Sequence, residues 1–152
     1  AWLAYACGLA EENGFICKLI DSVADDIDFD KTVKIVGDLN PKIVIIATGS
    51  EVSIAMKIAE ILQGVQVVSA PCLEWFDVQQ QSYKDIVLPK NTLKVSIEIG
   101  IGQGWREYVG DDGIVISLEH YGASASPKIL FEEYGFGPSA IAEKIKQQLN
   151  EN

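Results

Sequence analysis

Short apolar runs and helical repeats alternate along most of this chain. Residues 43–47 (IVIIA) form a continuous apolar run bounded by turn residues, which predicts a strand buried on both faces of a parallel sheet. Ser50 is a predicted helix N-cap. Residues 65–69 predict a second strand, and Gly64 before it suits a helix C-terminal cap. Between the two strands, apolar residues recur at helical spacing at Val52, Ala55, Met56, Ala59 and Leu62.

The remaining segments continue the alternation. Residues 73–89 predict one or two short helices that Pro89 stops, residues 102–110 predict a glycine-bounded helical turn, and two helices begin near Ser126 and Gly137. The predicted strands are 32–36, 43–47, 65–69, 93–100 and 114–120. Strands that alternate with helices imply a parallel sheet with right-handed crossovers. We therefore expect an α/β fold, a three-layer α/β/α domain with a mainly parallel sheet of about five strands.

Residues 1–32 differ from this regular body. They contain an apolar stretch (AWLAYACGLA), a turn at residues 12–14 and the acidic run DSVADDIDFD, with weak periodicity throughout. The pattern predicts a head of two short helices and an acidic linker at residues 1–32, followed by the α/β domain at residues 33–152. Because the chain begins with Ala1 rather than Met, we expect it to be a piece of a longer protein.

Charge excludes several classes of partner. The chain has 12 Lys and Arg against 22 Asp and Glu, a net charge of -10, so it lacks the basic footprint of a nucleic-acid or anionic-membrane binder. No apolar run approaches the roughly 20 residues of a membrane span. The cysteines Cys7, Cys17 and Cys72 are odd in number and unrelated in spacing, which favours reduced thiols and a cytoplasmic location.

The turn Thr48-Gly49-Ser50 is the first candidate ligand site. Its backbone N–H groups stand at a predicted helix N-terminus, where an anion can bind. The turn lacks the lysine of a P-loop and the spaced glycines of a dinucleotide fingerprint, which favours a structural turn. Residues 100–104 (GIGQG) are a weaker candidate, since no strand, helix and acidic residue complete a nucleotide motif there. We expect a close-packed loop at that position.

Other candidates follow the predicted strands. His120, the single histidine, lies beside Tyr121 at a predicted strand end, where ligands gather in open α/β sheets. A lone histidine favours a hydrogen-bonded structural or interface role, and Cys72 is expected to be a buried thiol. Trp105, Arg106 and Tyr108 can serve an interface or complete the core. Four glutamates could suggest paired carboxylates, of which the last two favour a solvated helix face: Glu98, Glu119, Glu132 and Glu133.

Four segments of the body closely resemble the carboxy-terminal domain of transketolase. They are IIATGSEVSIAMKIAEIL, VVSAPCLEWFDVQQQSYKDIVLP, VSIEIGIGQGWREYVG and LEHYGASASPKILFEEYGFGPSAIAEKIK. The family's order and spacing hold from about residue 33 to about residue 146. The head, in contrast, does not look like the end of the pyrimidine-binding domain that precedes this domain in the family.

The resemblance implies a part of a transferase of the pentose phosphate pathway. Transketolase moves a two-carbon ketol unit between sugar phosphates with thiamine diphosphate and a divalent metal, Mg or Ca, and works as a homodimer. In the family the cofactor binds to the first two domains, through a GDG motif that this chain lacks. The resemblance therefore implies no catalytic, cofactor-binding or metal residue here, and contact with other transketolase domains and a second subunit. The alternative is a free-standing α/β module that binds a small anionic metabolite at the strand carboxyl ends.

Overall fold

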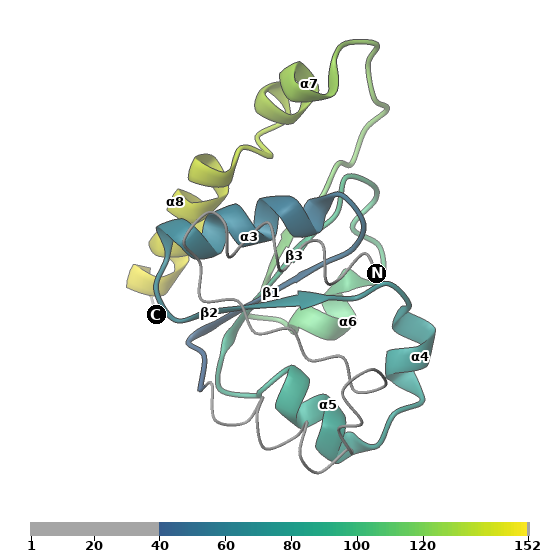
Figure 1. Cartoon of the computed structure of the whole chain (residues 1–152), viewed down its shortest axis with the longest axis vertical. Helices are drawn as coiled ribbons and strands as arrows, with labels where there is room; N and C mark the ends of the chain where they lie inside the picture. The colour runs from purple at the N-terminus through teal and green to yellow at the C-terminus, as the bar shows by residue number, and fades with distance from the viewer. Residues whose placement is uncertain (1–39, 152) are drawn as a thin grey trace, which may run out of the picture. The chain divides into compact units, whose positions relative to one another are not determined.

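The computed structural model describes residues 40–151 (Figure 1). The predicted strand 32–36, the helices and acidic linker of the head, and the thiols of Cys7 and Cys17 lie outside these residues. The predicted boundary at residue 33 therefore stays a prediction. In the described part of the chain, no helix is long and apolar enough to cross a membrane.

A parallel sheet forms the centre of the described domain. Its strand order is β2-β1-β3-β4, and every neighbouring pair is parallel. The fold class is confirmed, with four strands in the described range against the expected five or so. The strands are β1 (Ile43–Ala47), β2 (Val65–Ser69), β3 (Leu93–Ile97) and β4 (Ile114–Ile116).

Helices cover both faces of the sheet, which confirms the three layers. Helices α3 (Glu51–Ile61) and α8 (Pro138–Glu151) pack on one face. Helices α4 (Leu73–Asp77), α5 (Gln81–Val87) and α6 (Trp105–Val109) lie on the other side (Figure 1). The short α7 (Pro127–Glu133) stands beyond one end of the sheet, after a long connection from β4.

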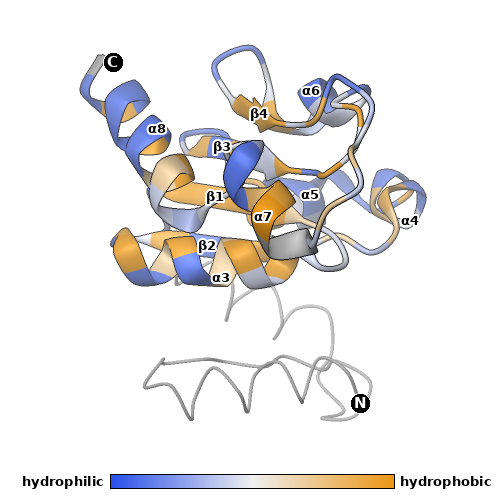
Figure 2. Ribbon diagram, turned by 90° about the horizontal axis from the view of Figure 1, so that it is seen from above, coloured by the Kyte–Doolittle hydropathy of each residue, from blue (hydrophilic) through white to orange (hydrophobic). Residues whose placement is uncertain are grey.

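Strand β1 shows why the apolar run IVIIA is informative. All five of its residues are buried, and Figure 2 colours this central strand as hydrophobic. Side chains alternate between the faces of a strand, so Ile43 and Ile45 join the core under α3 and α8. Val44 and Ile46 join the opposite core, with Trp105 and Val109 of α6. A strand covered on both faces needs apolar residues at every position.

Helix α3 has a different buried face from the predicted one. Ile54, Ala55 and Ile58 are buried together with Leu62, whereas Met56 and Ala59 are only half-buried. The buried set recurs at helical spacing and so forms one face of α3 against the sheet.

Three predicted boundaries are also corrected. The C-cap of α3 is Leu62, and Gly64 (φ +72°) instead stands at the entry to β2, where its carbonyl accepts hydrogen bonds from the backbone N–H groups of Lys42 and Ile43. Strand β3 ends at Ile97 rather than Gly100, and β4 ends at Ile116 rather than His120. Each strand stops at a polar residue, Glu98 after β3 and Ser117 after β4.

Candidate functional site

The connections after the four strands form one edge of the domain, called here the carboxyl edge. It comprises residues 48–50, 70–80, 98–104 and 117–126, and the second of these ranges contains α4. Because the strands are parallel, all four connections leave the sheet at the same edge. In Figure 1 this is the side from which the chain passes into α3, α4 and the long connection to α7. Every candidate residue named from the sequence except Glu132 and Glu133 lies on this edge or on α6 beside it.

The turn from β1 into α3 is built around a glycine and a buried carboxylate. Gly49 has φ +56°, the left-handed region that favours glycine, which agrees with a structural turn. Ser50 occupies the N-cap position of α3, as predicted. Its side chain makes no capping hydrogen bond, because the hydroxyl donates to Glu51 Oε2 at 3.0 Å instead. Glu51 is buried, with 7% of its surface exposed.

Negative charge at this turn disfavours an anionic ligand. Glu98, at the end of the neighbouring strand β3, has a pKa raised by burial and by the negative charge of Glu51. The negative charges of these two carboxylates lie near the α3 N-terminus and offset the positive end of the helix dipole. The electrostatics of the turn therefore suit a structural contact better than a phosphate.

The expectation of a close-packed GIGQG loop holds at Gly102 only, because Ile101, Gln103 and Gly104 are exposed. A Cβ built on Gly102 would lie 2.7 Å from Ser117 Oγ and 2.9 Å from Val115 Cγ1, so a larger residue does not fit. The Gly102 backbone N–H donates to Glu119 Oε1 at 2.9 Å, and Ser117 Oγ donates to the same oxygen at 2.6 Å. These two hydrogen bonds lower the pKa of Glu119. Glu119 thus fastens the connection after β4 to the connection after β3.

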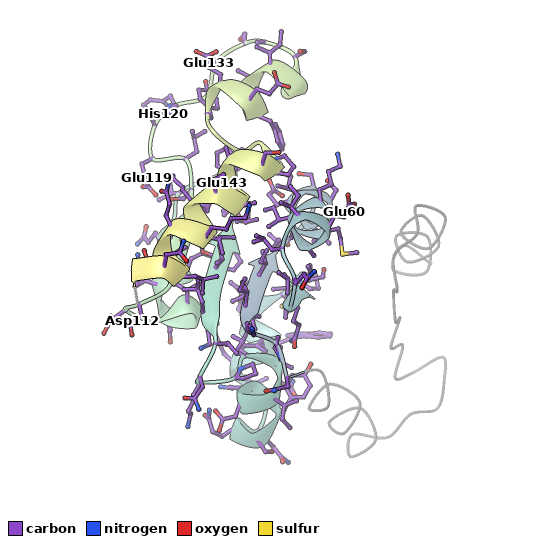
Figure 3. The ribbon with its side chains drawn as sticks, turned by 90° about the vertical axis from the view of Figure 1, so that its left-hand side faces the viewer. Glu60, Asp112, Glu119, His120, Glu133 and Glu143 are labelled. Carbon is purple, nitrogen blue, oxygen red and sulfur yellow. The ribbon has the colours of Figure 1, made fainter. Side chains whose placement is uncertain are left out.

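His120 and Tyr121 follow Glu119 on the exposed connection to α7. Figure 3 shows Glu119 and His120 side by side on this connection. His120 Nδ1 lies 2.8 Å from the Tyr121 carbonyl oxygen, and the ring packs edge-to-face on Tyr134, with centroids 4.9 Å apart. Tyr121 itself is 99% exposed. The imidazole is therefore held by local contacts.

The three candidates on α6 have separate roles. Trp105 is buried in the second core, so the core alternative holds for this residue. Tyr108 donates to both carboxylate oxygens of Asp77 on α4, at 2.9 and 3.1 Å. Arg106 Nη1 donates to the carbonyl oxygens of Gly110 and Gly113, at 3.1 and 2.8 Å. The guanidinium group fastens the turn between α6 and β4.

The other sequence candidates stay apart. Cys72 is half-buried rather than buried, and its thiol donates to Glu74 Oε2 at 3.4 Å. Glu132 and Glu133 are exposed on α7, as predicted for a solvated helix face. Among residues 40–151, no group of three or more His, Cys, Asp and Glu side chains could hold a metal ion.

Sequence reasoning missed two features of this edge. One is the pair of hydrogen bonds to Glu119, and the other is the buried position of Glu51. A glutamate at the first position of a helix usually predicts an exposed residue. The signal that could have found Glu119 is the serine two residues before it, since both side chains point to the same side of an extended chain.

Fold and edge together define an open, parallel α/β domain without a P-loop or dinucleotide fingerprint. Residues 33–137 match the family model described as the transketolase-like TK C-terminal domain. The chain belongs to this family.

Known proteins agree with the assignment. The chain is 48% identical over 110 residues to a transketolase of Aquifex aeolicus, and 44% identical over 115 residues to one of Mycobacterium tuberculosis. These matches cover 69% and 72% of this chain but only 16% of each relative. A solved transketolase from Leishmania mexicana superposes with a TM-score of 0.68 at 33% identity, and the match covers 74% of this chain and 17% of that one. A Pichia stipitis transketolase solved in complex with sedoheptulose-7-phosphate gives 0.67 at 33% identity, covering 72% and 16%.

Proposed function

We propose that this chain serves as the carboxy-terminal structural and assembly domain of a transketolase. The complete enzyme would transfer a two-carbon ketol unit between sugar phosphates. One observation carries the proposal: residues 33–137 match a C-terminal domain family, and the chain spans only about one-sixth of the curated transketolases that it matches. The Pichia relative in complex with a ketose phosphate supports sugar phosphates as the substrate class of the complete enzyme.

The cofactor site would belong to the preceding domains. Thiamine diphosphate is held through a divalent metal, Mg or Ca, and the described residues offer no set of side chains for such an ion. The sequence has no GDG motif either, and Gly110-Asp111-Asp112 forms only the turn between α6 and β4. The nearest other string, Gly37-Asp38-Leu39, lies outside the described residues. Since residues 40–151 offer no such site and the sequence has no GDG motif, the chain alone is proposed to be inactive.

The partners would be the other transketolase domains and a second subunit of a homodimer. We propose the strand-end loops as the contact region, including the candidate residues Thr48, Gly49, Ser50, His120 and Tyr121. Arg106 would support this region from α6 by holding its own turn. A cytoplasmic location is proposed from the thiol content and the family's chemistry.

Two measurements test the proposal. The purified chain, supplied with thiamine diphosphate, Mg²⁺, a ketose phosphate and ribose 5-phosphate, should give no ketol transfer, and calorimetric titration with the cofactor should give no heat. Measurable turnover by the chain would overturn the proposal. The second is the upstream reading frame, which should encode a GDG motif and a pyrimidine-binding domain. A start codon directly before Ala1 would contradict it.

A further inference from the structure

The most exposed apolar side chains of the described domain lie on three of the connections that form the carboxyl edge. Seven large hydrophobic residues are exposed among residues 40–151, and the four most exposed all follow strand ends. Trp75 and Val78, on and just after α4, are 76% and 80% exposed, Ile101 after β3 is 67% exposed, and Tyr121 after β4 is 99% exposed. Figure 2 shows α4 at the outside of the domain, with hydrophilic and hydrophobic colours mixed along it.

Local structure does not explain why these side chains are apolar. Trp75 lies on the same short helix as Asp77, which Tyr108 fixes in place, so the helix has a fixed orientation while its tryptophan faces outward. Tyr121 follows a residue pair that hydrogen bonds and ring packing hold, yet its own ring is exposed. Single exposed apolar residues are ordinary, but four large ones on one edge are typical of an interaction surface.

The charge of the edge specifies the chemistry of its partner. Residues 48–50, 70–80, 98–104 and 117–126 contain no lysine or arginine. They carry four carboxylates, on Glu74, Asp77, Glu98 and Glu119. A complementary surface would therefore be apolar at its centre and bordered by lysine or arginine side chains.

We propose that the carboxyl edge is the surface on which this domain docks against the preceding part of a transketolase polypeptide, with Trp75, Val78, Ile101 and Tyr121 as its apolar contacts. The inference rests on the proposed function, because the occupant is the remaining five-sixths of the relatives, which precede a C-terminal domain in the chain. Tryptophan and tyrosine are enriched among residues that dominate interface affinity. The family match thus identifies the partner, and the exposed side chains identify the surface that contacts it.

The test uses the full 152-residue chain and the Aquifex aeolicus transketolase truncated before its own C-terminal domain. The truncated enzyme should bind the unmodified chain, as measured by calorimetry and co-elution. The double variant Trp75→Ser/Tyr121→Ser should bind more weakly by on the order of tenfold or more. The matched control is Ile61→Ser/Leu149→Ser, which removes two exposed apolar residues away from the carboxyl edge, 44% and 43% exposed, and should change affinity less than about twofold.

Each outcome decides something different. Trp75 and Tyr121 are 76% and 99% exposed, so their replacement should leave thermal unfolding of the isolated chain nearly unchanged, which separates docking from folding. Ile61→Ser/Leu149→Ser should lower the melting temperature somewhat, because more than half of each of these side chains is buried. If the unmodified chain binds and both double variants bind equally well, the docking surface is wrong while the assembly function stands. If the unmodified chain does not bind, the proposed function itself fails. If the chain alone forms dimers that Trp75→Ser/Tyr121→Ser dissociates, the occupant is a second copy and the inference is overturned.

Discussion

Gly49 sets the direction in which the chain leaves β1. Its φ of +56° permits the turn, and a Cβ there would lie 3.6 Å from Glu51 Oε2, an ordinary contact distance. The cost of a substitution is therefore conformational rather than steric, and it is largest for β-branched residues.

Gly49→Val should lower the free energy of unfolding by about 1–3 kcal/mol, the usual cost of a residue held in a sparsely populated backbone region. The measurement is denaturant unfolding of the whole chain. Gly122→Val is the matched control, because Gly122 is exposed, its φ is not positive, and a Cβ added there would meet no atom within 4 Å. If both variants unfold at the same denaturant concentration, Gly49 does not hold the turn.

The hydroxyl of Tyr108 on α6 donates to Asp77 on α4, so ionisation of this hydroxyl should weaken the contact between the two helices. Burial of the hydroxyl, its hydrogen bond to Asp77 and nearby negative charges raise the pKa of Tyr108 to about 12, from a usual value of 10.0. The folded state keeps this proton at a pH where the unfolded chain has lost it. The stabilisation from Tyr108 is therefore complete below pH 10 and falls as the pH rises from 10 toward about 12.

Absorbance titration of tyrosine should show one ionisation at about pH 12 that disappears in Tyr108→Phe. Tyr121→Phe serves as the control, since that ring is exposed and makes no contact with Asp77. A late ionisation that persists in Tyr108→Phe would show that another group is responsible.

At the scale of elements, the Arg106 side chain holds the turn between α6 and β4. Arg106→Met keeps the aliphatic part of the side chain and removes the donors to the Gly110 and Gly113 carbonyl oxygens. We expect a loss of about 1 kcal/mol, because these hydrogen bonds are exposed to solvent. Hydrogen exchange of the Gly113 amide, which donates to the Gly110 carbonyl at 3.3 Å, should become faster.

Glu107→Gln gives the comparison for Arg106→Met. Glu107 is the exposed neighbour on the same helix, and the hydrogen bonds to the turn carbonyls come from Arg106. An unchanged exchange rate of Gly113 in Arg106→Met would contradict the role given to the guanidinium group.

Elements that rest on apolar periodicity could be predicted from the sequence. The predicted runs 43–47 and 65–69 match the observed bounds of β1 and β2. Strand β1 is buried throughout, so it ends where its apolar run ends, whereas β2 is half-buried and ends at the exposed Ser69. The ends of β3 and β4 could not be predicted, since apolar residues continue past both strands, at Ile99 and Leu118. The contact of Glu119 with the Gly102 loop joins two segments that are distant in sequence. The role of Arg106 could not be predicted from the sequence either, because its hydrogen-bond partners are backbone carbonyls, which every residue has.

At the scale of the whole molecule, the described domain has a well-covered hydrophobic core and a carboxyl edge that exposes large apolar side chains. Both faces of the sheet are covered by helices, whereas the carboxyl edge exposes Trp75, Val78, Ile101 and Tyr121. A core that needs no further partner and an edge that exposes large apolar residues are the properties expected of a domain within a larger assembly.

The central claim is that this chain is an assembly domain of transketolase. Its most direct test replaces the matching C-terminal part of the Aquifex aeolicus transketolase with residues 33–152 of this chain. Ketol transfer and subunit mass are then measured with thiamine diphosphate and Mg²⁺ present. The account predicts an assembled, active enzyme, in contrast to the same enzyme truncated without a replacement. A hybrid that folds but neither assembles nor transfers the ketol unit better than the truncated form would contradict it.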